Sequence, residues 1–280
     1  MKVLKFGGTS VGSAQRMKDV AKLIVGEKNL IVLSAMSGTT NSLVEISDYL
    51  YKKNPDGANE IINKLSQKYF GHIDELYATE EYKEKARELV TFHFDHIRSF
   101  TKDLFTLFEE KVVLAQGELI STGMMNLYLQ EQGVNSVLLP ALDFMRTDKN
   151  AEPDPVYIKE KLNRLLEENA GADLYITQGY ICRNAYGEID NLQRGGSDYT
   201  ASLIGAAIKA EEIQIWTDID GMHNNDPRFV KGTSPVRHLH FEEAAELAYF
   251  GAKILHPTCI LPAKINNIPV RLLNTMQPDA

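Results

Sequence analysis

A lysine and a glycine-rich turn stand together near the start of the chain, and both can act on a phosphate group. Lys5 belongs to an apolar run, Val3–Phe6, and Gly7 and Gly8 follow that run directly. Glycines let backbone N–H groups approach an anion closely, and the N-terminus of a following helix adds partial positive charge. The segment is not a P-loop, because Ser13 stands where that motif requires lysine. The pattern indicates a phosphate-binding turn, and an ordinary strand–helix turn is the alternative.

A second glycine turn joins a strong anion-binding side chain to an acidic one. Arg194 precedes Gly195 and Gly196, and its planar guanidinium suits a carboxylate or a phosphate. Ser197 is expected to cap a helix that follows, which places Asp198 in its first turn. Capping alone would explain the serine and the aspartate, but an arginine beside two glycines favours ligand binding.

Further polar residues lie where predicted strands end or where apolar segments are interrupted. These are Ser34–Thr40, Gly117–Glu118 just before a predicted helix, Asp218–Arg228, and Lys253 within an apolar stretch. Carboxyl ends of parallel strands form the ligand crevice of an open α/β sheet. Lysine, arginine, aspartate, threonine and glycine at one such edge are the residue types that phosphoryl transfer requires.

The elements that must position these residues alternate between strands and helices. Nearly continuous apolar runs predict buried parallel strands at Val3–Phe6, Leu30–Ser34, Ser136–Leu139, Leu174–Thr177, Ile213–Thr217 and Val270–Leu273. Helical spacing follows the first run, and Asp154-Pro155 opens another helix. The alternation predicts a three-layer α/β sandwich with a largely parallel central sheet. Trp216 is expected in the core.

One stretch, from about 43 to 110, contains no convincing strand. It has helix-forming sequence broken at Asn54-Pro55, and it predicts a helical insertion or lobe packed against the sheet. His93 and His96 have a spacing that metal ligands use, but no supporting cysteine or carboxylate pattern accompanies them, which favours surface or core histidines.

Composition limits the classes of function. The 280 residues carry 30 Lys and Arg against 38 Asp and Glu, a net charge of −8, which disfavours nucleic acid and anionic lipid as partners. No apolar run is long enough to span a membrane, and the N-terminus does not resemble a signal peptide. Cys182 and Cys259 form neither a disulfide framework nor a zinc site. We therefore expect a soluble cytoplasmic protein.

Taken in order, these motifs resemble those of one known family. The matching segments are Lys5-Phe6-Gly7-Gly8-Thr9-Ser10, Gly117-Glu118, Gly195-Gly196-Ser197-Asp198, Trp216-Thr217-Asp218 and Gly251-Ala252-Lys253-Ile254-Leu255-His256-Pro257. They resemble the catalytic domain of aspartate kinase, a member of the amino-acid kinase superfamily with the carbamate kinase-like fold. The resemblance covers essentially the whole chain. It implies transfer of the ATP γ-phosphoryl group to the side chain of L-aspartate, giving L-4-aspartyl phosphate and ADP, the first step toward lysine, threonine and methionine.

The resemblance also implies a role for individual residues. Lys5 and Lys253 would flank the transferring phosphoryl group, and Asp198 would orient these lysines. Since the attacking carboxylate is ionised at neutral pH, no general base is needed. Arg194 would bind the substrate α-carboxylate and Glu118 its ammonium, while Ser34, Thr40 and Ser197 complete the aspartate site. The expected ATP-binding residues are Lys5, Gly7, Gly8, Thr217, Asp218, His223, Arg228, Lys253 and Ile254. Mg²⁺ would accompany ATP and bridge its phosphates.

Two alternative functions remain at this point. Another enzyme of the superfamily would phosphorylate glutamate, acetylglutamate or a nucleotide, but Arg194 and Glu118 together match the two charged ends of a free amino acid. A catalytically silent nucleotide-binding regulatory subunit would be expected to lack at least one of Lys5, Asp198 and Lys253.

The family resemblance also suggests how the chain is organised. We expect a substrate part over about 1–190 and a nucleotide part over about 191–280, and a homodimer is a possible assembly. The chain stops just past its last predicted strand, so the ACT regulatory domains of the family are expected to be absent. Activity should then be indifferent to lysine and threonine.

Overall fold

A six-stranded parallel sheet forms the centre of the protein, as predicted. The computed structural model describes residues 1–193, 195–219, 221–226, 229–250 and 255–279. The strand order is β3-β4-β2-β1-β7-β8, and every neighbouring pair is parallel. The strands are β1 (Val3–Phe6), β2 (Leu30–Leu33), β3 (Ser136–Leu138), β4 (Leu174–Gln178), β7 (Ile213–Thr217) and β8 (Val270–Asn274). Each coincides with a predicted strand to within one residue at either end.

The sheet separates two hydrophobic cores because strand side chains alternate between its faces. Leu4 and Phe6 of β1 pack with α1 (Ala14–Ile24) and α5 (Leu107–Glu131) on one face. Val3 packs on the other face with α7 (Pro155–Glu168) and α8 (Gly196–Ile208). Lys5 shares the parity of Val3, so its side chain is directed toward the layer that contains α8. Trp216 is buried in the first core and stacks on Phe6 with ring centroids 5.6 Å apart.

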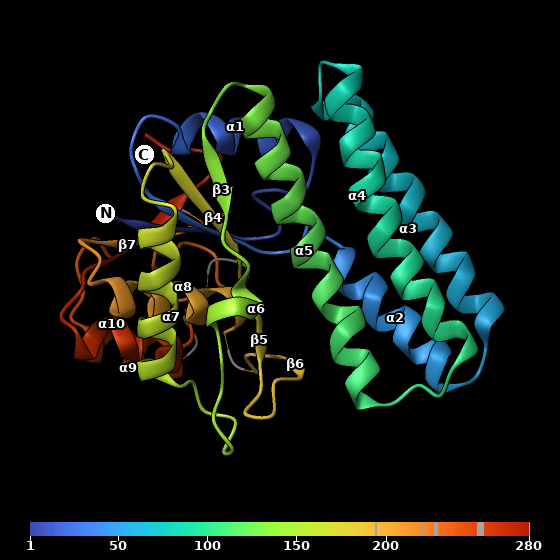
Figure 1. Ribbon diagram of the computed structural model, residues 1–280. Coiled ribbons are helices and arrows are strands. Elements are labelled where there is room, and N and C mark those ends of the chain that lie inside the picture. The colour runs from blue at the N-terminus through green and yellow to red at the C-terminus, as the bar shows by residue number, and fades with distance from the viewer. Residues whose placement is uncertain (194, 220, 227–228, 251–254, 280) are drawn as a thin grey trace.

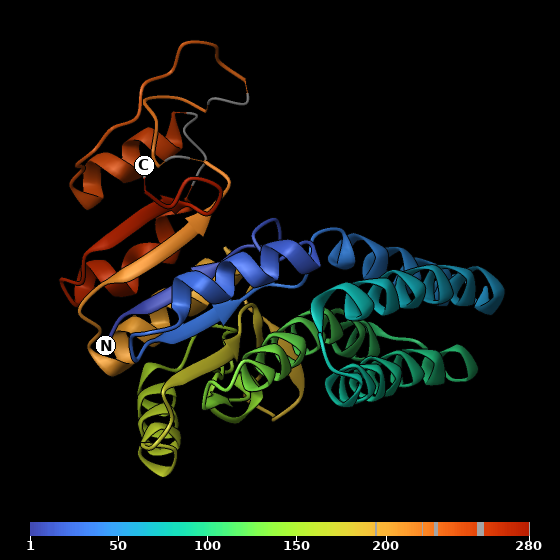
Figure 2. The ribbon, with the colours of Figure 1, turned by 90° about the horizontal axis from the view of Figure 1, so that it is seen from above.

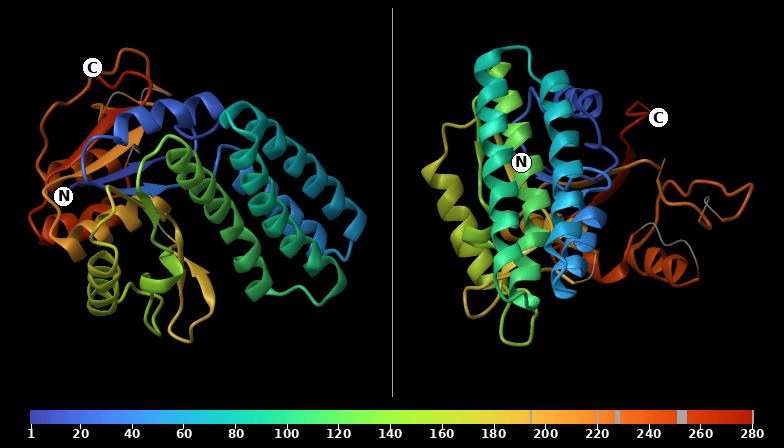
Figure 3. Two further views of the ribbon diagram at one scale, coloured as in Figure 1. Left: turned by 45° about the horizontal axis from the view of Figure 1, so that its top comes forward. Right: turned by 90° about the vertical axis from the view of Figure 1, so that its right-hand side faces the viewer.

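The predicted helical lobe is present and extends from one side of the sheet (Figures 1 and 2). It consists of α2 (Thr39–Tyr51), α3 (Pro55–Leu76), α4 (Glu80–Ser99), the short 3₁₀ helix η1 (Phe100–Lys102) and the N-terminal half of α5. Pro55 occupies the first turn of α3, and the Asn54 side chain accepts a hydrogen bond from the Gly57 N–H, which explains the helix boundary at this position. Figure 3 shows these long helices lying side by side.

Shorter elements complete the chain. A two-stranded antiparallel hairpin, β5 (Ile181–Arg183) and β6 (Ile189–Asn191), lies between β4 and α8 and was not predicted. The remaining elements are α6 (Ala141–Phe144), α9 (Phe241–Tyr249), η2 (Pro257–Ile260) and α10 (Leu261–Ile265). Among the described residues, no helix is long and apolar enough to cross a membrane.

The expectation that Gly117-Glu118 precedes a helix is wrong, because both residues lie in the middle of α5. The helix begins ten residues earlier, where Thr106 and Glu109 form a capping box. Glycine is needed at 117 for packing: a Cβ there would lie 2.8 Å from Cβ of Ala35. The close approach of α5 to the end of β2 brings Glu118 into contact with the residues that follow that strand.

Candidate active site

An ion pair joins the end of β1 to the start of α8. The Lys5 Nζ atom lies 2.7 Å from Oδ1 of Asp198, and both side chains are largely buried, with exposed fractions of 12% and 20%. Strand parity directs Lys5 toward α8, and Asp198 lies in the first turn of that helix. The carboxylate therefore fixes the position of the lysine ammonium at the edge of the sheet where β1 ends.

The glycine turn after β1 is held close to its neighbours. The Gly7 N–H donates to the Trp216 carbonyl, and the Ser37 N–H donates to the Gly8 carbonyl. A Cβ on Gly8 would lie 2.8 Å from the Ala35 carbonyl oxygen, and one on Gly7 would lie 3.5 Å from Lys5 Nζ. Position 8 thus requires a residue without a side chain, whereas a Cβ at position 7 would make only ordinary contacts. The lysine ammonium lies next to the turn, as an anion-binding site requires.

Glu118 is a buried carboxyl group that faces the same region. Its side chain is 4% exposed, and one carboxylate oxygen accepts a hydrogen bond of 3.3 Å from the Ala35 N–H. Burial raises the pKa of Glu118 to about 8, and the hydrogen bond from Ala35 offsets only part of this effect. The site therefore favours a cationic partner that could compensate the buried charge once Glu118 ionises.

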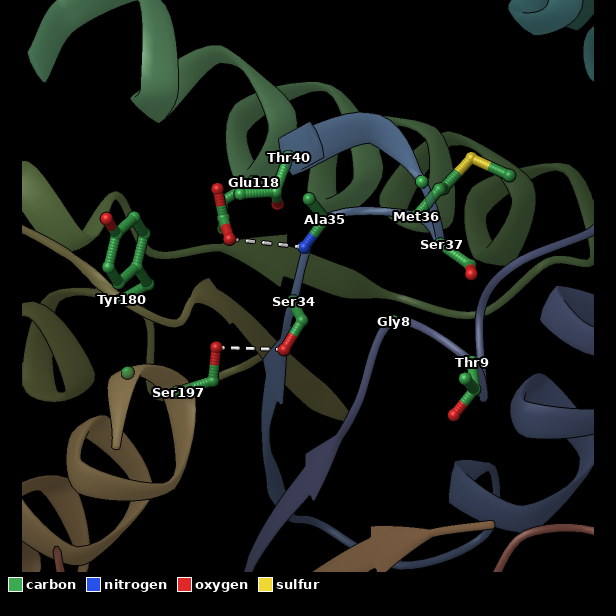
Figure 4. Close-up of a pocket in the computed structure, with 12 residues that line it drawn as sticks. Gly8, Thr9, Ser34, Ala35, Met36, Ser37, Thr40, Glu118, Tyr180 and Ser197 are labelled. Atoms are coloured by element: carbon green, nitrogen blue, oxygen red, sulfur yellow. Dashed lines mark hydrogen bonds between the residues drawn. The ribbon is translucent and has the colours of Figure 1, made fainter. Parts of the chain in front are cut away.

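Two serines link the end of β2 to the start of α8. Ser34 Oγ donates to Ser197 Oγ over 2.8 Å (Figure 4). The expectation that Ser197 caps α8 is wrong: the cap is Gly195, in a left-handed conformation with φ of 69°, and Ser197 lies inside the helix. Its hydroxyl accepts from Ser34 and so faces the pocket. A Cβ on Gly179 would lie 2.3 Å from Ser197 Oγ, so glycine is required at the end of β4.

Several of these residues line a cavity of about 500 Å³. Lys5 and Asp198 are not among the lining residues, and they are linked to them in the sequence only through the glycine turn and Ser197. The pocket brings together predicted site residues from four separate segments: Gly8, Ser34, Thr40, Glu118 and Ser197. Figure 4 shows Glu118 and Thr40 on one side of it and the two serines below them. This convergence is what the shared edge of a parallel sheet predicts.

Other lining residues were not predicted. They are Thr9, Ala35, Met36, Ser37, Gly38, Tyr180 and Gly196. Tyr180 has a positive φ of 70°, which is unusual for a bulky residue, and its backbone is held by the Thr200 hydroxyl and by the Leu192 N–H. Its place three residues after the predicted strand Leu174–Thr177 is the signal that could have identified it.

Of the described residues predicted to bind ATP, Gly8 lines this pocket, whereas Thr217, Asp218 and His223 do not. Thr217 ends β7, which pairs with β1, and Thr217 Oγ1 donates to the exposed Asp218 carboxylate over 3.2 Å. His223 is 5% exposed, and its Nδ1 atom lies 2.9 Å from Thr233 Oγ1. The predictions for Arg194, Arg228, Lys253 and Ile254 fall outside the described residues.

His93 and His96 of the lobe differ in burial: one lies in the core and the other at the surface. His93 is buried, and its Nδ1 atom lies 2.6 Å from Oε1 of Gln116 on α5. His96 is exposed on α4. Within the ranges that the structure describes, no group of three or more His, Cys, Asp or Glu side chains could hold a metal ion.

Fold and site together define a class of protein. Residues 1–274 match the amino acid kinase family, and the chain belongs to that family.

Within the family, the chain is similar to aspartokinases. Aspartokinase 3 of Arabidopsis thaliana, a chloroplastic protein, is 36% identical over 295 residues, which cover 99% of this chain and 51% of the relative. Lysine-sensitive aspartokinase 3 of Escherichia coli is 34% identical over 99% of this chain and 62% of the relative. The crystal structure of Escherichia coli aspartokinase III with aspartate and ADP superposes with a TM-score of 0.89 at 33% identity, covering 100% of this chain and 63% of the other. The chain thus spans between about half and just under two thirds of these relatives.

Proposed function

We propose that the protein transfers the ATP γ-phosphoryl group to the side-chain carboxylate of L-aspartate, giving L-4-aspartyl phosphate and ADP. The observation that carries the proposal is the Lys5–Asp198 ion pair, which lies beside the glycine turn at the edge of a pocket that contains a buried carboxyl group. Similarity to aspartokinases supports it, and one of these was solved with aspartate and ADP.

In this proposal the residues act by position and charge. Lys5 stabilises negative charge that develops on the transferring phosphoryl group, and Asp198 keeps the ammonium aligned while leaving its other donors free. The free carboxylate of the substrate is the nucleophile, so no side chain has to remove a proton. Lys253 would act with Lys5 from the opposite side.

The aspartate site follows from the pocket. Glu118 would face the substrate ammonium, because that contact compensates the cost of ionising a buried carboxyl group. Ser34, Thr40 and Ser197 offer hydroxyl groups around the same cavity. Arg194 would bind the α-carboxylate with its bidentate guanidinium.

The nucleotide would occupy the side of the pocket formed by the ends of β1 and β7. Gly7, Gly8, Thr217 and Asp218 lie there, and His223, Arg228, Lys253 and Ile254 are proposed to complete the site. In the proposed division, about 1–190 provides most of the aspartate site and about 191–280 most of the nucleotide site. Gly7 and Gly8 would contribute to the nucleotide site, and Arg194 and Ser197 to the aspartate site, from across that boundary.

Mg²⁺ is proposed to arrive with ATP. The donor set suits this arrangement: the described residues provide no cluster of three metal-binding side chains, whereas nucleotide phosphates supply the oxygen ligands that Mg²⁺ prefers. A homodimer and a cytoplasmic location stay predictions.

The competing function is phosphorylation of a different substrate by a member of the same superfamily. A comparison of substrates separates this function from phosphorylation of aspartate. We expect ADP release with L-aspartate, and an acyl phosphate product that hydroxylamine traps as the hydroxamate. L-glutamate, N-acetyl-L-glutamate and UMP should give at most background rates. ADP release with one of these three and none with aspartate would overturn the proposal.

The Arg194→Lys variant tests the substrate geometry separately. The lysine ammonium cannot make the two parallel hydrogen bonds that a guanidinium makes to a carboxylate. The aspartate KM should therefore rise at least about tenfold, while the ATP KM changes little. The opposite pattern, a lost affinity for ATP with unchanged aspartate saturation, would place Arg194 in the phosphate site.

A further inference from the structure

Helix α3 of the lobe holds the loop that lines the pocket between β2 and α2. The Tyr69 hydroxyl lies 2.7 Å from the Thr39 hydroxyl, and both side chains are 1% exposed. One residue earlier, Lys68 Nζ donates to the Ser37 carbonyl oxygen over 3.0 Å. Adjacent residues of one helix thus fix two points of the Met36–Thr40 segment.

This segment has no cap of its own. Gly38 is the residue before α2, it has a φ of 82°, and no side chain caps the helix there. The first turn of the helix therefore depends on contacts from elsewhere to hold its direction. The contacts from Lys68 and Tyr69 come from a helix that starts 15 residues after this segment.

Thr39 connects the lobe to the substrate side of the pocket. A Cβ on Gly117 would lie 3.3 Å from Cγ2 of Thr39, so Thr39 packs directly against the turn of α5 that carries Glu118. The next residue, Thr40, lines the pocket itself. A shift of Thr39 would therefore move Thr40 relative to Glu118.

We propose that Tyr69 and Lys68 are positioning residues for the aspartate site, and that the helical lobe thereby sets the distance between Thr40 and Glu118. The proposal rests on the proposed function, because it assigns that pocket to aspartate. Neither residue touches the substrate; both act through the Ser37–Thr39 backbone and hydroxyl.

Tyr69→Phe tests the hydroxyl contact while keeping the aromatic ring in place. Thr39 Oγ1 would lose its partner in a buried position, and such a group reorients or recruits water. We expect the aspartate KM to rise about tenfold and the ATP KM to change by less than about twofold. Lys68→Met should raise the aspartate KM about threefold, since its contact is exposed.

Two variants provide matched controls. The Tyr77 hydroxyl, at the end of α3, is also buried and donates over 2.6 Å to the Met124 carbonyl oxygen, and neither residue lines the pocket. Lys18 Nζ donates over 2.7 Å to the Glu75 carbonyl oxygen, as Lys68 does to Ser37. Tyr77→Phe and Lys18→Met should lower thermal stability similarly and leave both KM values unchanged.

Hydrogen exchange supplies a readout that does not depend on turnover. In the ligand-free protein, amides of residues 36–40 should exchange at least about fivefold faster in Tyr69→Phe than in Tyr77→Phe. Equal exchange in the two variants, or an aspartate KM equally raised in both, would overturn the inference. If the unmodified protein fails to phosphorylate aspartate, the proposed function fails, and the exchange comparison still tests the contact.

Discussion

Replacing Glu118 by glutamine should stabilise the protein, and increasingly so as the pH rises. The carboxyl group is almost fully buried, and this burial raises its pKa to about 8 against an ordinary value of 4.5. In the folded protein it keeps its proton up to about pH 8, whereas in the unfolded chain it loses the proton near 4.5. Folding therefore binds a proton throughout this window, and the free energy of unfolding falls as the pH rises through it.

The size of the effect follows from that difference. At about 1.4 kcal/mol per pH unit, the window from pH 4.5 to 8 corresponds to a loss of about 5 kcal/mol in the free energy of unfolding. Above pH 8 this loss stays constant. The Glu118→Gln variant has a side chain of similar shape without a titrating group. Its stability relative to the unmodified protein should thus increase by about 3 kcal/mol between pH 5.5 and pH 8.

Urea unfolding at several pH values measures this difference. Trp216 is the single tryptophan and is buried, so its fluorescence reports unfolding in both proteins. A stability difference that stays constant from pH 5.5 to 8 would refute the reasoning, because it would mean that Glu118 titrates as it does in the unfolded chain. Calorimetry of aspartate binding at pH 7 should in addition detect a proton released to buffer, since the substrate ammonium favours the ionised form.

Three further predictions concern the glycine turn and its neighbours. Lys5→Met should lower kcat by about 10²–10³ with a smaller change in the aspartate KM, measured by steady-state kinetics; a near-normal kcat would contradict its role. Gly8→Ala should cost about 1–3 kcal/mol in urea unfolding because its Cβ meets a backbone carbonyl, whereas the control Gly71→Ala, in open space on α3, should not destabilise. Ser10 and Thr275 share a buried hydroxyl–hydroxyl bond of 2.6 Å, so a double-mutant cycle of Ser10→Ala and Thr275→Val should give a coupling energy of about 1 kcal/mol; strict additivity would show that the bond contributes nothing.

The sequence predicted the central sheet well because its four inner strands, β1, β2, β4 and β7, are largely buried on both faces and therefore read as continuous apolar runs. The hairpin of β5 and β6 escaped prediction for the opposite reason: each strand has three residues, and Asp190 and Arg183 interrupt any apolar pattern. Pro55 gave the start of α3 correctly. Gly117 misled the prediction for α5, since a glycine needed for close packing resembles one that ends or precedes a helix.

The candidate site was predictable where a residue follows a strand directly. Gly8 and Ser34 follow β1 and β2, and the parallel sheet brings them together; Lys5, inside β1, and Ser197, in the first turn of α8, were found from the glycine turns beside them. The contact between Tyr69 and Thr39 could not be predicted, because nothing in the spacing of two helix-forming segments tells which hydroxyl groups will meet. Tyr180 was missed because its backbone conformation, rather than its residue type, distinguishes it.

The contact between Gly195 and Cys259 makes the rate of thiol labelling a measure of local opening. A Cβ on Gly195 would lie 1.6 Å from the Cys259 sulfur, so the thiol fills the space that glycine leaves beside the turn before α8. The second cysteine, Cys182, is equally inaccessible, and both side chains are 0% exposed. A thiol reagent can therefore react with Cys259 only while the structure around it opens, and the rate of labelling in a Cys182→Ser background measures that opening. If ATP and aspartate slow this labelling, their binding stabilises the region around Cys259 against opening.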